Sequence, residues 1–289
     1  MKQEYTVNEP QELLPFLSEK FPDTSRSKVK ELLAHSVYVN GRRTSQFNFP
    51  LQRGMKVTIE KVTGNDRLRP RDLDIVYEDQ HLFVVNKHEG LLSYSKNPAD
   101  KTVITVLNQY LEASHRRCFA HVVHRLDRDT SGLLLVAKSK EVSRQFEQDW
   151  KQTVHDRAYV ALLWGHPQPP QGEYRSWLTD GEFCVLSSPT DNGGKLAVSH
   201  YRTVRTSRRY ALVEFQLDTG RRNQIRVHAR EMGHPVVHDP MYGYKDDISP
   251  VNRLCLHAYR LGFTHPVTGK KLEFKTPVPP EFERLINTI

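Results

Sequence analysis

The chain has 289 residues, 37% of them hydrophobic, and carries 42 Lys and Arg against 34 Asp and Glu, a formal charge of +8. This size allows one large domain and one small domain, and the charge favours an anionic partner, nucleic acid before a membrane surface, over a merely soluble basic protein. Cys118, Cys184 and Cys255 form no CxxC pair and no apolar run approaches about 18 residues, so the composition indicates no zinc motif, disulfide framework or membrane span.

The N-terminal residues predict a basic helix in a cytoplasmic protein. The opening MKQEYTVNEPQELL lacks the apolar core of a secretion signal. In TSRSKVKELLAHS (24–36), apolar residues recur at helical spacing at Val29, Leu32 and Leu33. Arg26 and Lys30 are four residues apart and share the face away from this apolar stripe, where they are candidate RNA contacts.

A hairpin and a linker follow this helix. VYVNGRR (37–43) alternates into an Asn-Gly turn, which is a strong hairpin signal. Arg42 and Arg43 come directly after the turn and add to the basic surface. The polar stretch 62–71 lacks apolar periodicity and has the composition of a linker.

The remaining residues predict an α+β domain with a mainly antiparallel mixed sheet and flanking helices. Alternating or apolar stretches bounded by turn residues indicate most of its strands. The segment 221–233, RRNQIRVHAREMG, is plausibly helical. The strands are expected at 75–77, 82–85, 159–164, 197–204 and 210–217 and in a hairpin within 254–277.

The segment HRLDRDTSGLLLV (124–136) is a candidate catalytic loop that precedes a buried strand. Asp127 lies between Arg125 and Arg128, and a nearby arginine lowers the pKa of a carboxylate. The turn at 130–132 and the strand behind it would hold the loop against a rigid sheet. The alternative is an exposed ion pair of no catalytic importance.

A second basic segment lies between residues 218 and 235. Arg221, Arg222, Arg226 and Arg230 would lie near one face if this segment is helical. Arginine forks suit phosphate oxygens, so a phosphate-binding track is one interpretation. A solvated basic helix is the other.

Other chemistries lack support in the sequence. His121 and His124 have a spacing found in some metal sites, but no metalloprotease pattern accompanies them. Ser131 and His200 lie outside any G-x-S-x-G elbow. The glycines form neither G-x-G-x-x-G nor a P-loop. We therefore expect neither a metal nor a cofactor.

These motifs resemble the RluA-type pseudouridine synthases, whose signature is HRLDxxTSG. The segments RAYVALLWGHP, TGRRNQIRVHAREMGHPVVHDPMYG and LCLHAYRLGFTHPVTGKKLEF also resemble this family in the expected order. The resemblance implies a pseudouridine synthase catalytic domain at 72–289, after the linker at 62–71. Residues 10–61 resemble the S-four RNA-binding module that often precedes this domain.

The resemblance also implies roles for individual residues. Asp127 matches the catalytic aspartate, and Tyr159 matches the tyrosine that packs on the target base. Arg226 matches the basic residue that pairs with the aspartate. Arg125 matches the arginine expected to enter the RNA stack, and the remaining RNA-binding candidates are Arg26, Lys30, Arg42, Arg43, Arg221 and Arg222.

Four positions depart from the family pattern and bear on substrate choice. Asn223 stands where the family usually has His, and His88 stands where it usually has Pro. LLSYS (91–95) replaces an apolar-His-Pro ending. QELLPFL (11–17) replaces the R-L-D of the RNA-binding module.

The resemblance implies an isomerase that converts uridine to pseudouridine without a cofactor, in large-subunit ribosomal RNA or tRNA. We expect a monomer, because no heptad or large apolar stripe is present. One alternative is a non-catalytic RNA-binding or ribosome-assembly protein on the same fold. The other is a glycosidic hydrolase that uses Asp127 with Asp129 as paired carboxylates.

Overall fold

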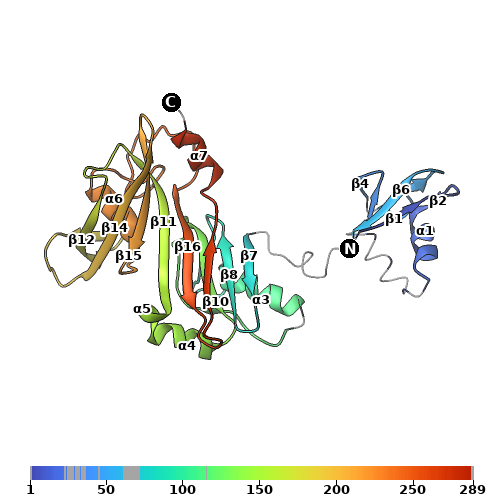
Figure 1. The fold of residues 1–289 in the computed structure, drawn as a ribbon, viewed down its shortest axis with the longest axis horizontal. Coiled ribbons are helices and arrows are strands. Elements are labelled where there is room, and N and C mark those ends of the chain that lie inside the picture. The colour runs from blue at the N-terminus through green and yellow to red at the C-terminus, as the bar shows by residue number, and fades with distance from the viewer. Residues whose placement is uncertain are drawn as a thin grey trace. The chain divides into compact units, whose positions relative to one another are not determined.

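The computed structural model describes residues 2–22, 24, 29, 33, 37–44, 46–60, 72–114 and 116–287. The chain divides into two compact units, residues 1–69 and 70–289, and each is described by itself (Figure 1). Most of the helix expected at 24–36, including Arg26 and Lys30, lies outside the described residues, as does the expected linker at 62–71.

The N-terminal unit is built on a small antiparallel sheet with the strand order β1-β6-β3-β4. Asn40 and Gly41 form the turn between β3 and β4 with φ values of 49° and 78°, which confirms the predicted hairpin. The helix with described bounds is α1 (Leu13–Lys20). The strands are β1 (Lys2–Thr6), β3 (Val37–Val39), β4 (Arg42–Arg43) and β6 (Lys56–Glu60), and β2 (Gln11–Glu12) pairs separately with β5 (Pro50–Leu51).

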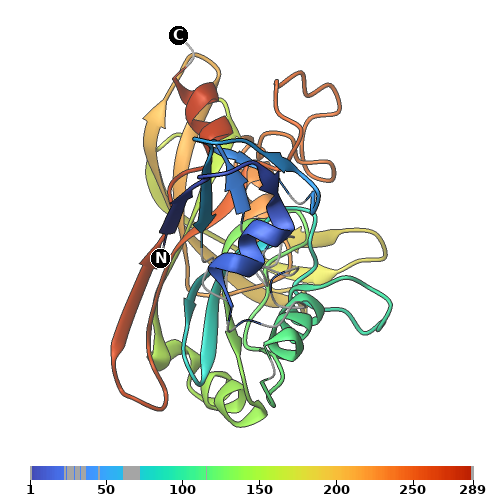
Figure 2. The ribbon, with the colours of Figure 1, turned by 90° about the vertical axis from the view of Figure 1, so that its right-hand side faces the viewer.

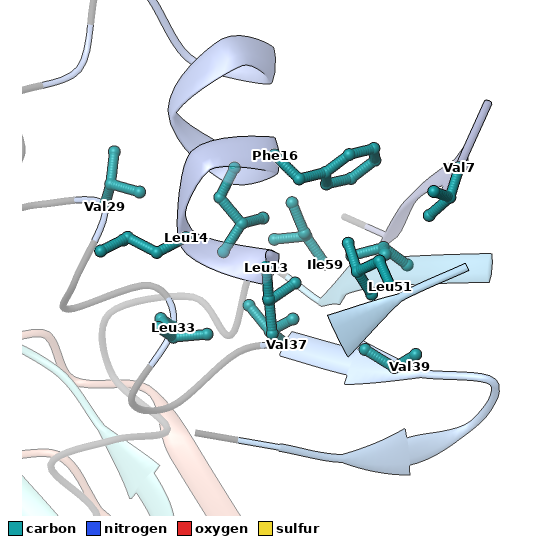
Figure 3. Packing of buried hydrophobic residues seen from close by; sticks show 12 residues of the cluster. Val7, Leu13, Leu14, Phe16, Val29, Leu33, Val37, Val39, Leu51 and Ile59 are labelled. Carbon is teal, nitrogen blue, oxygen red and sulfur yellow. The ribbon is translucent and has the colours of Figure 1, made fainter. Parts of the chain in front are cut away.

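One face of α1 and the strands of this unit enclose a hydrophobic core. Figure 3 shows Leu13, Leu14 and Phe16 of α1 packed near Val37 and Ile59 of the strands. Val29 and Leu33, from the helix expected at 24–36, are also buried in this cluster. The predicted apolar stripe therefore does contribute to the core at these two positions.

The larger unit is built on an 11-stranded sheet with the order β13-β12-β14-β15-β11-β16-β10-β8-β7. Strand β17 pairs with β16, and β9 pairs with β10. Among the described strand pairs of this sheet, β10 with β16 is parallel and the others are antiparallel. The strands are β7 (Leu73–Glu78), β8 (Leu82–Lys87), β9 (His121–Val122), β10 (Ser131–Ala137), β11 (Val154–Trp164), β12 (Gln171–Asp180), β13 (Val185–Ser188), β14 (Lys195–Thr206), β15 (Tyr210–Leu217), β16 (Leu256–Thr264) and β17 (Lys271–Lys275).

Helices flank this sheet, which confirms the predicted α+β class. In Figures 1 and 2, α7 lies at one end of the strands and α4 lies at the opposite end. Phe146 of α4 is fully buried in a cluster with Leu133 and Leu135 of β10. The helices are α3 (Val103–Ala113), α4 (Lys140–Gln148), α5 (Trp150–Thr153), α6 (Gln224–Glu231) and α7 (Pro280–Ile286).

The start of β10 fixes the end of the candidate catalytic loop. All seven residues of this strand are buried, as its apolar sequence predicts. Gly132 has a φ of 115°, and a Cβ at this position would overlap the backbone of Ala258 on β16. Glycine is therefore required where the loop enters the sheet.

Candidate active site

A cavity of about 390 Å³ lies between the 123–130 loop, the middle of β11 and the turn before α6. It brings together five of the residues predicted from the sequence, although these are far apart along the chain. The five residues that line it are Arg125, Asp127, Tyr159, Arg221 and Arg222.

The loop that carries Asp127 is fastened through its backbone. The hydroxyl of Ser93 donates to the carbonyl oxygen of Leu126 at 2.7 Å and accepts from the N–H of the same residue at 3.0 Å. The N–H of Thr130 donates to the carbonyl oxygen of Asp127 at 3.2 Å. Because backbone groups carry these contacts, they fix the path of the loop rather than any one side chain.

Lys87, the last residue of β8, holds the far side of the same loop. Its side chain is 0% exposed, and its Nζ donates to the carbonyl oxygens of His88, Leu91 and Arg128 at 3.0, 2.9 and 2.8 Å. Burial lowers the pKa of this amine to about 8, although the charge of Asp129 opposes the shift. The third bond ties the sheet to the residue that follows Asp127.

Burial dominates the electrostatics of Asp127 and raises the pKa of its carboxyl. Nearby positive charges limit the rise, in the order Arg226, Arg125 and Arg222. The backbone N–H of Asn223, which donates to the carboxylate, also lowers this pKa. The arginines therefore lower the pKa of this carboxyl, as the sequence predicts, but burial outweighs them. The reason is that the loop is packed against the sheet and shielded from water.

The direct partner of Arg226 is Asp239, which differs from the expected pairing with Asp127. Arg226 is 5% exposed, and its Nε and Nη2 donate to the two carboxylate oxygens of Asp239 at 2.7 Å each. This side chain points inward from α6, and it acts on Asp127 through its charge. Sequence neighbours offered no indication of this partner, because a turn brings Asp239 back toward α6.

Arg128 stands between Asp127 and Asp129 in the sequence, and of these two carboxylates it contacts Asp129. Its Nε and Nη2 donate to Asp129 at 3.0 and 3.3 Å. Asp129 is therefore committed to an exposed ion pair, whereas Asp127 faces the cavity. This division weakens the interpretation of Asp127 and Asp129 as a matched catalytic pair.

Tyr159 lies on β11, opposite Phe215 of β15 and Ala258 of β16. The residue is 6% exposed and lines the cavity. Burial raises the pKa of its hydroxyl, and the charge of Asp127 adds to the rise while Arg157 opposes it. A flat, neutral ring beside a buried carboxylate can pack against a planar base.

His124 forms part of the cavity wall and is held in one tautomer. Its Nε2 accepts from the N–H of Leu135 at 3.0 Å, so a neutral ring carries its proton on Nδ1. Burial, and then the charge of Arg157, lowers its pKa to about 3. Its ring lies 5.2 Å from that of Trp150, another residue of the cavity wall. Within the described residues, no group of three or more His, Cys, Asp or Glu side chains could hold a metal ion.

The predicted arginine track is divided by the start of α6. Arg221 and Arg222 lie in the turn before the helix and are exposed, and Arg230 is exposed near the helix end. Arg226 is buried, so the four arginines do not share one face. Of the candidates in the N-terminal unit, Arg42 and Arg43 lie on β4, and the structure describes only their backbone.

Sequence reasoning missed Asp239 and Lys87. The available signal for Asp239 is the Val236-Val237 pair before it: both are buried, and Val236 forms an isolated bridge with Leu163. Asp239 accepts from the N–H groups of Met241 and Tyr242 in the turn that follows. Lys87 ends an apolar strand, where a lysine is ordinarily an exposed terminal residue.

Comparisons with known proteins agree on one family. A family model described as RNA pseudouridylate synthase matches residues 81–231. Ribosomal large subunit pseudouridine synthase D of Escherichia coli O157:H7 is 33% identical, over 94% of this chain and 89% of that protein. The uncharacterized RNA pseudouridine synthase YlyB of Bacillus subtilis (strain 168) is also 33% identical, over 95% of this chain and 92% of the relative.

A solved structure has the same fold. The human RNA pseudouridylate synthase domain containing 1 protein matches with a TM-score of 0.59 and 25% identity. The match covers 72% of this chain and 84% of the human chain.

Proposed function

The chain belongs to the RNA pseudouridylate synthase family and is an isomerase that converts uridine to pseudouridine in RNA, and on this premise we propose that its substrate is large-subunit ribosomal RNA. The names of relatives that match along nearly the whole chain support this choice. Transfer RNA is the other substrate considered from the sequence, and the experiment below distinguishes the two.

The observation that carries the proposed mechanism is the shared cavity of Asp127 and Tyr159. In the reaction the bond between the ribose C1′ and N1 of uracil breaks, and the base turns. C1′ then bonds to C5. C5 loses its hydrogen as a proton, and N1 gains a proton. A carboxylate can attack the sugar carbon, stabilise positive charge on it or accept a ribose proton. Each of these roles requires Asp127 to be ionised.

Tyr159 would pack on the uracil ring and exchange a proton through its hydroxyl. Tyr159→Phe keeps the ring and removes only the hydroxyl, so we expect turnover to fall while RNA affinity is unchanged. If Tyr159→Phe turns over as fast as wild type, the hydroxyl exchanges no proton and Tyr159 only stacks on the base.

The target uridine must leave its stack to reach the cavity, at a cost of a few kcal/mol. Arg125 is exposed at the cavity and is the candidate to fill the vacated position. Arg221 and Arg222, which also line the cavity, would hold phosphates at the same opening. Phe183, 78% exposed at the tip of the β12–β13 hairpin, offers a further ring for stacking.

The N-terminal unit would add affinity as an S-four-like RNA-binding module spanning residues 10–61, joined by a linker at 62–71 to the catalytic domain at 72–289. Its basic candidates are Arg26, Lys30, Arg42 and Arg43. The double substitution Arg42→Gln and Arg43→Gln should lower the salt dependence of RNA binding, since each lost phosphate contact reduces the slope by about one. An unchanged slope would show that these arginines do not contact phosphates.

The protein would act in the cytoplasm as a monomer. In the described part of the chain, no helix combines the length and apolar character needed to cross a membrane. Sedimentation of the purified chain tests the monomer.

The decisive experiment maps pseudouridines in total RNA from cells with and without the gene. We expect one or a few large-subunit sites to disappear and to return with wild type but not with Asp127→Asn. Loss of tRNA sites instead would overturn the proposed substrate and keep the activity. Purified protein that binds ribosomal RNA but forms no pseudouridine would favour the non-catalytic alternative.

A further inference from the structure

Asn223 adopts an unusual backbone conformation directly beside Asp127. It precedes α6 with φ 54° and ψ 18°, in the left-handed region. That region costs most residues about 1–2 kcal/mol, and asparagine enters it more readily than others. In this conformation the Asn223 N–H donates to the Asp127 carboxylate, while the Asn223 carbonyl oxygen accepts from the N–H of Val227 at 2.9 Å.

The side chain of the same residue joins two further groups. Its Oδ1 accepts from Nη1 of Arg226 at 3.0 Å, and its Nδ2 donates to the hydroxyl oxygen of Tyr242 at 3.2 Å. The ring of Tyr242 lies 5.1 Å from the Arg226 guanidinium. The Tyr242 hydroxyl also accepts from the N–H of Val185 at 2.8 Å, so a neighbouring strand holds it in place.

One residue thus touches the carboxylate through its backbone and the cation through its side chain. We propose that Asn223 is a positioning residue for the isomerisation, which fixes Asp127 and Arg226 relative to one another. This inference rests on the proposed function only in treating Asp127 as the catalytic carboxylate. Asn223 itself is 6% exposed and acts through the two charged groups.

The amide suits this task because it supplies one acceptor and one donor without charge. An aspartate at this position would also tolerate the left-handed backbone. However, it would supply only acceptors, and it would add a third negative charge beside Asp127 and Asp239. A neutral imidazole, the group expected here from the family pattern, again offers one acceptor and one donor and is tolerated at positive φ. Asn223→His is therefore the conservative variant.

The first test is independent of RNA. The Asp127 carboxyl is titrated by ¹³C NMR in the full chain, and its signal is assigned by its disappearance in Asp127→Asn. Asn223→Gly keeps the left-handed backbone without strain and removes both side-chain bonds. We expect the Asp127 pKa to rise by about one unit, because Arg226 loses its bond to the Asn223 side chain and is held less firmly near the carboxylate.

Asn40→Gly is the matched control, since Asn40 is also left-handed, with φ 49°, and accepts from the N–H of Lys56 within the other unit. It should leave the Asp127 titration unchanged. Asn223→His should restore most of the wild-type value. Tyr242→Phe, which removes only the hydroxyl, should shift the pKa in the same direction as Asn223→Gly but by less.

The second test uses turnover on an RNA that wild type modifies. Asn223→Gly should lower kcat about ten-fold with KM within about two-fold, because carboxylate orientation is lost and RNA affinity is kept. The acid limb of its pH profile should move to higher pH. An unchanged Asp127 titration in both Asn223→Gly and Tyr242→Phe overturns the inference, whichever RNA is the substrate. Failure of wild type on ribosomal RNA would overturn only the proposed substrate.

Discussion

Lys87 at the end of β8 and Arg226 in α6 are two buried cations beside the loop of Asp127, and their partners differ in kind. Lys87 is surrounded by three backbone carbonyl oxygens, whereas Arg226 forms a two-point ion pair with Asp239. Burial lowers the Lys87 pKa to about 8. The hydrogen bond and charge of Asp239 outweigh burial at Arg226, so the pKa of this guanidinium rises.

This difference in partners means that raising the pH can remove the charge of Lys87 but not the charge of Arg226. An arginine keeps its charge at every physiological pH, so the potential it exerts on Asp127 is constant. A lysine held by carbonyl oxygens fixes backbone positions, and an uncharged amine can still donate to two of them. Lys87 therefore helps to fix the backbone of the Asp127 loop, and Arg226 exerts a constant electrostatic potential on Asp127.

The largest effect on turnover is expected when the carboxylate of Asp127, which lies near both cations, is removed. Asp127→Asn should lower turnover at least about a thousand-fold while RNA affinity is kept. Asp129→Asn is the matched control, because its partner is Arg128, and it should retain turnover. Loss of turnover in both variants would mean that Asp129 is also required for the reaction.

The same substitution should stabilise the fold at neutral pH. Since burial raises the Asp127 pKa, ionising this group costs folding free energy above that pKa. We expect Asp127→Asn to increase the free energy of unfolding by about 1 kcal/mol at pH 7. Denaturant titrations at falling pH should show this gain shrink as wild-type Asp127 becomes protonated. A gain that is constant with pH would contradict the direction of the shift.

Breaking the ion pair should cost more stability than any exposed pair. Asp239→Asn leaves Arg226 buried without its full counter-charge, and such losses cost about 3–5 kcal/mol. Glu173→Gln removes the partner of Arg175 from an exposed pair at 2.9 Å and should cost less than about 1 kcal/mol. Equal losses in urea unfolding would mean that the buried geometry contributes nothing extra.

The lysine predicts a pH dependence that the arginine does not. A folded-state pKa of about 8, below the value of the unfolded chain, means that wild-type stability rises between about pH 8 and pH 10.5 relative to Lys87→Met. The gain should approach about 3 kcal/mol, since one pKa unit is worth about 1.4 kcal/mol. Lys101→Met, at an exposed site, corrects for the loss of one positive charge. Parallel profiles for wild type and Lys87→Met would refute the shift.

The smallest effect on turnover and stability is expected when only the side chain of Arg128 is changed. Lys87 contacts the backbone carbonyl of Arg128, so Arg128→Gln should leave turnover within about two-fold. Its exposed pair with Asp129 is worth less than about 1 kcal/mol. A large loss of stability would mean that this surface pair, and not the carbonyl, fastens the loop.

The elements that local sequence controls were predicted well. The strands predicted at 75–77 and 82–85 correspond to β7 and β8, and the hairpin predicted within 254–277 is formed by β16 and β17, so the structure confirms both. Asp127 and Tyr159 were identified by resemblance, and both line the cavity. Their catalytic roles stay predictions.

The partners of buried charges could not be predicted in the same way. Six consecutive residues of α6, from Gln224 to Ala229, are buried, so no polar face marks which way Arg226 points. Its pairing with Asp239 depends on a turn in which His238 has a φ of 56°. A positive φ is uncommon for residues other than glycine, so local sequence gives little indication of this turn.

The parallel pairing of Gly132 with Ala258 bears on how the enzyme is made. The ribosome synthesises the chain from its N-terminus. The loop of Asp127 therefore emerges long before Asn223, Arg226, Asp239 and β16. A nascent chain that already carries the whole HRLDRDTSG signature still has no catalytic pocket. Activity therefore requires that synthesis has passed β16, and a product truncated before this strand would carry the signature without the chemistry.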